Sequence, residues 1–544
     1  MKQNKVKNSV KSAQQDFSKV VNANIPRSTF YRPSTLVTTL NAGYLVPIYI
    51  DEILPGDTFK MKLQHVSRLI TPIVPPMDNI DLEFFAFFVP NRIVWSGWQK
   101  LNGENQTSAW TPASQPVGVP MYNLSAVVEE NKAGDYYGLP VGMNTLNHPV
   151  NILPFRGYRK IWNDWFRNQN VQAPLIESIN DTYMSVDTTI NQPLLKVNKP
   201  FDYFTSCLPA PQKGESQLIP IDLNELLPII TTNDEVTSNH IPMKLRDTLG
   251  NHVTNKGILG VNATSNLAYV QADAFTDTAT FHPSNLWAKT TGANNATIND
   301  LRTAFQIQRL YERDARGGTR YVEMLKAHFG VDAGDYRLQR PEFLGSSRTM
   351  VNMQQVPQTG ETGTTPQGNI AAYGHSQGND FLFNKSFVEH GFLHIFAVAR
   401  HKKTYQQGLD RFWSRQDRLD YYLPVLAHIS EQPVYTKELY ALADNKDDVF
   451  GYQEAWADYR YKPNRVTGQM RSAATTSFDI WHFADEYGSA PTLSDTWMQD
   501  NSDTNLQRIL AVQTGNQIKL NVRFDLEATR PIPVNSIPGL IDHF

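Results

Sequence analysis

The residues that could perform catalysis are scattered along this chain of 544 residues and do not form the pattern of a common active site. Two acidic pairs, Asp410 with Asp417 and Asp447 with Asp448, could serve a glycosidase, in which two carboxylates flank the scissile bond. Such pairs arise by chance among 53 acidic residues. The P-loop, zinc-protease, nucleophile-elbow and dinucleotide-binding motifs do not occur. We therefore predict no catalytic residue and no enzymatic activity.

Metal and redox chemistry have equally little support in the sequence. The thirteen histidines show no spacing typical of metal ligands. The single cysteine, Cys207, cannot form an intrachain disulfide or a multi-cysteine metal site. We interpret Cys207 as a small hydrophobic side chain. No metal and no cofactor are expected.

The N-terminal segment concentrates positive charge. Residues 1–20 contain one acid, Asp16, and few large apolar residues, and their lysines are Lys2, Lys5, Lys7, Lys11 and Lys19. The formal net charge of −3 gives the whole chain no attraction to nucleic acid, so any such contact needs a local patch. We predict that this segment, residues 1–20, stays mobile until it binds a polyanion. The alternative, that these lysines are merely solvated, stays open.

Two further clusters combine basic and aromatic residues, as nucleic-acid-binding surfaces do. They are Phe155, Arg156, Tyr158, Arg159, Lys160 and Trp162, and Tyr459, Arg460, Tyr461, Lys462 and Arg465. Structural ion pairs and subunit contacts explain these clusters equally well.

The elements that must position these residues are mainly β-strands. Residues 518–527 and 59–64 alternate between apolar and polar side chains, which predicts half-buried strands. The apolar run 509–512 precedes the turn at 514–516, so we expect it to form an antiparallel hairpin with 518–527. Residues 80–89 and 386–400 are apolar on both faces and need cover on each side.

Helices are fewer. Ile161, Trp162, Trp165 and Phe166 recur at helical spacing after Pro154. The segments 297–311 and 321–328 show the same spacing, and a break is expected at Arg316, Gly317 and Gly318 between them.

Amino-acid composition and the strength of the hydrophobic pattern distinguish further segments of the chain. A hydrophobic content of 40% with 19% charged residues supports a sizeable core, and no window is apolar enough for a membrane helix. The weakly patterned segment 209–295 is expected to be one long insertion, because structureless loops of that length are uncommon. Residues 345–380 are expected to be extended or rich in loops.

Several long sequence segments indicate a protein family, which hydrophobic periodicity alone does not. The phrases AGYLVPIYIDEILPGDTF (42–59), PPMDNIDLEFFAFFVPNRIVW (75–95) and LPFRGYRKIWNDWFRNQN (153–170) resemble the major capsid proteins of gokushoviruses, within the Microviridae. Phrases at 305–331, 337–345, 404–434, 448–468 and 534–544 agree and follow in the expected order. The resemblance covers nearly the whole chain.

This resemblance implies a mainly β fold, a single eight-stranded antiparallel jelly-roll barrel with long loop insertions and a few helices. It implies a T=1 icosahedral shell around circular single-stranded DNA, located in the virion and assembled in the cytoplasm of a host bacterium. The expected parts are a genome-facing arm (1–30), jelly-roll shell (31–208 and 298–544) and a three-fold surface insertion (209–297). The expected partners are copies of the chain itself, packaged DNA contacted by the arm lysines, minor virion proteins and a host surface receptor, without membrane insertion.

A different class of function also fits the composition. An aromatic-rich β framework could bind or hydrolyse carbohydrate, and two inward carboxylates in a cleft would distinguish that reading from a shell protein.

Overall fold

The computed structural model of this chain describes residues 26–104, 118–122, 126–181, 190–215, 298–442 and 447–535, and the backbone of six short strands between 229 and 288. The chain forms two compact units. One runs up to Pro211 and resumes at Asp314, and the other is Gln212–Arg313.

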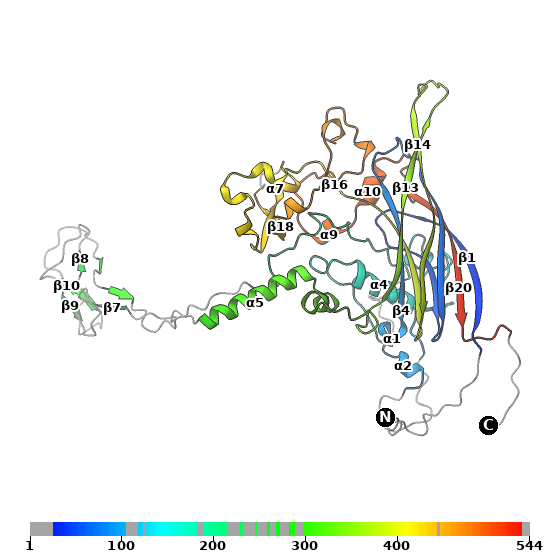
Figure 1. The fold of residues 1–544 in the computed structure, drawn as a ribbon, viewed down its shortest axis with the longest axis horizontal. Helices are drawn as coiled ribbons and strands as arrows, with labels where there is room; N and C mark the ends of the chain where they lie inside the picture. The colour runs from blue at the N-terminus through cyan, green and yellow to red at the C-terminus, as the bar shows by residue number, and fades with distance from the viewer. Residues whose placement is uncertain are drawn as a thin grey trace, which may run out of the picture. The chain divides into compact units, whose positions relative to one another are not determined.

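Eight strands of the first unit form one antiparallel system in which strands distant in the sequence are neighbours (Figure 1). They are β1 (Ser28–Leu40), β2 (Val46–Ile53), β3 (Thr58–Leu69), β4 (Ile80–Pro90), β13 (Glu342–Pro357), β14 (Ile370–Ser386), β15 (Gly391–His401) and β20 (Ile518–Arg530). Their order is β1-β20-β3-β14-β13-β4-β15-β2.

This order divides into two four-stranded sheets. The first sheet contains β1, β20, β3 and β14, and the second sheet contains β13, β4, β15 and β2. The two sheets are joined where the distal part of β13 pairs with β14, from Asn352 opposite His375 to Pro357 opposite Ile370. A double sheet of eight antiparallel strands with these long-range neighbours is a jelly roll, so the predicted fold class is confirmed.

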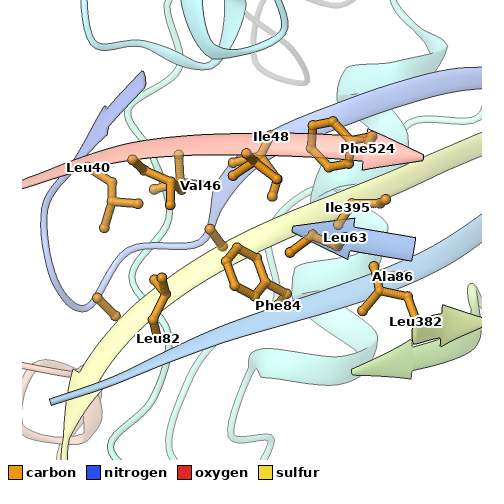
Figure 2. Packing of buried hydrophobic residues seen from close by; sticks show 14 of the residues in the cluster. Leu40, Val46, Ile48, Leu63, Leu82, Phe84, Ala86, Leu382, Ile395 and Phe524 are labelled. Atoms are coloured by element: carbon orange, nitrogen blue, oxygen red, sulfur yellow. The ribbon is translucent and has the colours of Figure 1, made fainter. Parts of the chain in front are cut away.

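The hydrophobic core lies between the two sheets (Figure 2). Leu63 and Phe524 point into it from the first sheet, and Phe84 and Ile395 from the second. Because side chains alternate between the faces of a strand, every second residue of β3 and β20 is buried and the others face outward. The strands predicted at 59–64 and 518–527 are confirmed.

The second sheet is covered on its outer face as well. Phe396 and Val398 of β15 and Phe87 of β4 are buried there in a second hydrophobic cluster with the helix α4 (Leu153–Ile161). Helix α4 approaches β15 closely, since a Cβ added at Gly157 would lie 2.8 Å from His394 Nε2. The prediction that these strands carry apolar side chains on both faces is confirmed, although β15 begins at Gly391 and not at 386.

The predicted hairpin between 509–512 and 518–527 is wrong. Strand β20 pairs with β1 and β3, whereas Leu510 makes only an isolated bridge to Pro72. Ile509 and Leu510 are nevertheless buried in the core beneath the barrel strands. Their apolar character reflects burial at the end of a helix, and β20 finds partners that lie hundreds of residues away.

Short helices and turns fill the connections. The helices are α1 (Asn91–Val94), α2 (Trp98–Leu101), α3 (Ala133–Tyr136), α4, α5 (Ile298–Gly317), α6 (Tyr321–Met324), α7 (Thr436–Leu439), α8 (Ala457–Arg460), α9 (Asp495–Met498) and α10 (Ser502–Gln507). Helices α4 and α6 each continue into a π-helical turn, Trp162–Phe166 and Leu325–Phe329. The three predicted helical segments and the break after Gly317 are confirmed.

The remaining strands are short. In the first unit they are β5 (Met121–Tyr122), β6 (Val150–Asn151), β16 (Thr404–Tyr405), β17 (Glu431–Tyr435), β18 (Val449–Glu454) and β19 (Asn464–Arg465). In the second unit they are β7 (Ile229–Thr231), β8 (Leu245–Arg246), β9 (Ile258–Val261), β10 (Ala268–Gln271), β11 (His282–Pro283) and β12 (Leu286–Ala288), paired as β7 with β12, β8 with β11 and β9 with β10. The stretch 345–380 is largely extended, in β13 and β14.

A buried network of charges fixes the end of β15. Lys403 Nζ lies 3.5 Å from a carboxylate oxygen of Asp500, and both side chains are 0% exposed. Lys199 pairs in the same way with Asp485 at 3.5 Å. Burial, together with the charge of Lys403, lowers the pKa of His401 to about 4, so this imidazole is neutral at pH 7. Two ammonium groups therefore face two carboxylates, and the network is balanced.

Removing one charge should destabilise the fold strongly. Asp500→Asn leaves the two buried lysines, Lys199 and Lys403, facing a single carboxylate, Asp485. Breaking a buried pair in this way costs about 3–5 kcal/mol. The free energy of unfolding of the full chain, measured by urea denaturation, should fall by that amount.

A surface pair provides the matched control. Glu527 lies 3.6 Å from Lys60, and both side chains are about half exposed, so Glu527→Gln should cost less than about 1 kcal/mol. Equal losses for the two variants would contradict a structural role for the buried network.

Candidate assembly surface

One acid of each pair considered for carbohydrate hydrolysis is engaged in an ion pair. Asp410 accepts hydrogen bonds from Lys462 (2.8 Å) and pairs with Arg465. Burial alone would raise the pKa of Asp410, but these two cations hold it below its ordinary value. Asp447 pairs with Lys437 at 2.9 Å. The general acid of a glycosidase needs a raised pKa, so the Asp410 environment is the opposite of what hydrolysis requires.

The other candidate residues have plain structural surroundings. Cys207 is buried in a hydrophobic cluster with Phe204 and Leu439, where burial raises the pKa of its thiol, so its interpretation as a small hydrophobe is confirmed. No cluster of three or more potential metal ligands occurs among the described residues. In those same ranges, no helix has the length and apolar character needed to cross a membrane. The arm lysines, Lys2, Lys5, Lys7, Lys11 and Lys19, lie outside the described residues.

The first basic and aromatic cluster is part of the protein interior. Arg156 is 4% exposed and donates to the carbonyl oxygens of Val94 (3.2 Å) and Asn180 (3.0 Å). Lys160 pairs with Asp164 (3.1 Å) and with Glu177 (3.0 Å). These contacts favour the structural interpretation of this cluster.

The second cluster belongs to a surface that the sequence did not reveal. Residues 409–429 follow β16 as a series of short 3-10 turns, Arg411–Ser414, Arg418–Asp420 and Pro424–Leu426. They expose large side chains beside α8. We define this aromatic shelf by its members Phe412, Trp413, Leu419, Tyr421, Tyr422, Val425, Tyr459 and Tyr461. Trp413 is 66% exposed and Val425 is 91% exposed.

One arginine holds the aromatic shelf in shape. The guanidinium carbon of Arg415 lies 4.4 Å from the ring centroid of Tyr459 and 5.7 Å from that of Tyr421. Arg415 also pairs with Asp458 of α8, and its side chain is only 7% exposed. Because the cation contacts both rings, it links the turns to the helix. The ring centroid of Tyr422 lies 6.3 Å from that of Tyr459.

The shelf rests on the strand pair β17 and β18. Arg411 donates to the carbonyl oxygen of Pro433 in β17 at 2.9 Å and lies 3.6 Å from Glu438. Trp456, which follows β18, donates its indole N–H to the carbonyl oxygen of Leu426 at 2.9 Å. These hydrogen bonds and this ion pair hold the turns against β17 and β18, while the outer aromatic rings stay exposed.

The composition of the aromatic shelf is typical of a protein-protein interface. Tyrosine, tryptophan and arginine are enriched at interface hot spots, and soluble monomers rarely expose large contiguous apolar patches. Exposed rings can also stack on sugars, but Asp410, an acid considered for hydrolysis near this surface, is paired with Lys462 and Arg465. The geometry therefore favours contact with another protein. The sequence signal was the density of aromatic and arginine residues in a segment without helical or strand periodicity.

Comparison with known proteins also indicates a protein that assembles with other protein subunits. The sequence model of the family described as capsid protein (F protein) matches residues 18–540. Capsid protein VP1 of Spiroplasma virus 4 is 39% identical over 545 aligned residues, which cover 96% of this chain and 97% of that protein. Capsid protein VP1 of Chlamydia phage 1 is 38% identical with the same coverage, and VP1 of Bdellovibrio phage phiMH2K is 38% identical over 98% of both chains.

These relatives are structural proteins, and their similarity extends over almost every element described above. The resemblance inferred from the sequence phrases is confirmed, and so is the prediction that the chain is not an enzyme. The chain belongs to the F-protein family of phage capsid proteins and is of the gokushovirus type within the Microviridae.

Proposed function

We propose that this major capsid protein assembles with copies of itself into a T=1 icosahedral shell that encloses circular single-stranded DNA. The observation that carries the proposal is the aromatic shelf, which one isolated subunit leaves exposed. Burying one large apolar side chain contributes about 1.5–3 kcal/mol, so several such rings in one contact are enough to hold subunits together. Assembly takes place in the cytoplasm of the host bacterium.

The basic arm supports enclosure of the genome. Its lysines, Lys2, Lys5, Lys7, Lys11 and Lys19, all lie within residues 1–20, and β1 begins at Ser28. Such an arm neutralises phosphates without requiring a positive charge on the whole chain. Minor virion proteins complete the particle.

The insertion 209–297 is proposed to face outward at the three-fold axes and to contact a host surface receptor. Its weak patterning is typical of a segment that is not part of the shell. Exchanging this segment between relatives should transfer host range. If host range stays unchanged after the exchange, the insertion does not determine which host is recognised.

Truncating the aromatic shelf should prevent assembly. In the double variant Trp413→Ala/Tyr421→Ala two exposed rings are lost, and interface residues of this kind cost about 2 kcal/mol each when truncated. The yield of closed particles, counted by electron microscopy and sedimentation velocity, should fall more than tenfold.

The matched control keeps both rings. Trp413→Phe/Tyr421→Phe should assemble nearly as well as the unchanged chain, and the circular dichroism of both variants should match it. Particle formation at the normal level by the alanine variant would exclude the shelf from subunit contacts.

Removing the arm should weaken DNA binding in a salt-dependent way. Deletion of residues 1–20 should flatten the dependence of the logarithm of the binding constant on the logarithm of salt concentration by roughly 0.7 for each lost phosphate contact. The measurement is fluorescence titration of a single-stranded oligonucleotide. An unchanged slope would mean that the arm lysines are merely solvated.

A further inference from the structure

The two sheets of the barrel differ in what covers their outer faces. The outer face of the second sheet is buried beneath α4 and neighbouring loops. On the first sheet, the outward side chains of β3 and β20 alternate with buried ones and stay largely exposed. Figure 1 shows β1 and β20 at one side of the barrel and α4 at the other. We call the outward side of β1, β20, β3 and β14 the open sheet face.

Positive charge dominates the open sheet face. Its exposed cations are Lys60, Lys62, Arg68, Lys519 and Arg523, and its acids are Asp525 and Glu527. Both acids are engaged, because Arg523 Nε lies 2.9 Å from Asp525 and Lys60 lies 3.6 Å from Glu527. Asp525 also accepts a hydrogen bond from the hydroxyl of Tyr31 at 2.8 Å.

Two of the cations on this face lie next to each other in one row that crosses the strands. Lys519 of β20 is directly opposite Arg68 of β3, and Arg68 is directly opposite His375 of β14. Neither Lys519 nor Arg68 has a carboxylate partner among the described residues. Side chains directly opposite each other on antiparallel strands lie about 5 Å apart at Cβ, and like charges in that position are destabilising. The fold therefore keeps two cations side by side at a cost in stability.

An imidazole extends the row. His375 Nδ1 is shielded from solvent and has no hydrogen-bond partner among the described residues. The ring centroid of His375 lies 5.7 Å from that of Tyr373, two residues earlier on the same strand and on the same face. A phosphate over Lys519 and Arg68 would meet an ammonium and a guanidinium. This set of donors suits a phosphate.

Exposed rings accompany the charges. Tyr31 of β1 is 62% exposed, and Phe381 of β14, opposite Lys62, is also exposed. Lys62 and Arg68 are six residues apart on one strand, a separation of roughly 20 Å. Cations spaced along a groove or sheet, with exposed aromatic rings beside them, are an arrangement by which proteins bind single-stranded nucleic acid through phosphates and stacked bases.

We infer that the open sheet face binds single-stranded nucleic acid, with Lys519 and Arg68 as its main phosphate contact. The inference rests on the proposed function, since the packaged genome supplies this ligand inside a shell. Strand β1, which forms the edge of the same sheet, continues directly from the basic arm.

The test measures binding of a fluorescein-labelled 20-nucleotide oligothymidylate by the full chain and its variants. Arg68→Gln/Lys519→Gln should weaken binding about tenfold or more at 0.1 M salt and lower the salt slope by roughly 1.4, which corresponds to two phosphate contacts. Because this variant removes an opposition of like charges, its melting temperature should stay the same or rise. A merely structural role would predict a lower melting temperature.

Two controls isolate the site. Arg302→Gln/Arg309→Gln removes the same charge from exposed positions of α5 and should leave the salt slope unchanged. Arg68→Lys/Lys519→Arg keeps both charges and should restore binding to within a few-fold of the unchanged chain.

The alternative occupant of this face is an acidic surface of a neighbouring subunit. If Arg68→Gln/Lys519→Gln binds the oligonucleotide normally, the inference is overturned, and a simultaneous loss of particles would assign the row to a subunit contact. Particle formation, scored separately by electron microscopy, tests the proposed shell function without reference to this face.

Discussion

Strands β4 and β15 carry apolar side chains on both faces, and such strands are stable only when each face is covered. The inner face packs against β3 and β20, where Phe84 and Ile395 meet Leu63 and Phe524 (Figure 2). The outer face is covered by α4, whose Gly157 permits close approach to His394. Satisfying this constraint occupies the long connections between strands. Among the described residues, the outer face of the first sheet stays exposed, and so do the aromatic rings of the turns that rest on β17 and β18.

The two surfaces that remain open have different chemistry. The aromatic shelf offers rings ordered by Arg415, which suits contact with another apolar protein surface. The open sheet face offers Arg68 and Lys519 without carboxylate partners among the described residues, which suits a polyanion. A shell subunit that encloses DNA, as we propose for this chain, needs both kinds of surface, because it must bind its neighbours and lie against a high density of phosphate groups. Membership of the capsid family gives these surfaces a common explanation.

Local patterns predicted the parts of the fold that depend on local burial. The alternation in 59–64 and 518–527 and the two-sided apolar run 80–89 identified barrel strands, because each pattern records which faces are buried. The partner of a strand is not a local property, so β20 was assigned to 509–512 and in fact pairs with β1 and β3. The aromatic shelf was missed for a related reason. Its 3-10 turns have no periodicity, and sequence does not distinguish exposed rings from buried ones. The row formed by Lys519 and Arg68 could be found only from the pairing register of two strands, because these residues lie 451 positions apart in the chain.

Electron cryo-microscopy of assembled particles tests the central claim most directly, because it shows which surfaces of each subunit are covered by another. The account predicts that Trp413 and Tyr421 of every subunit lie buried against a neighbouring copy. A closed particle in which the aromatic shelf stays exposed to solvent would contradict it.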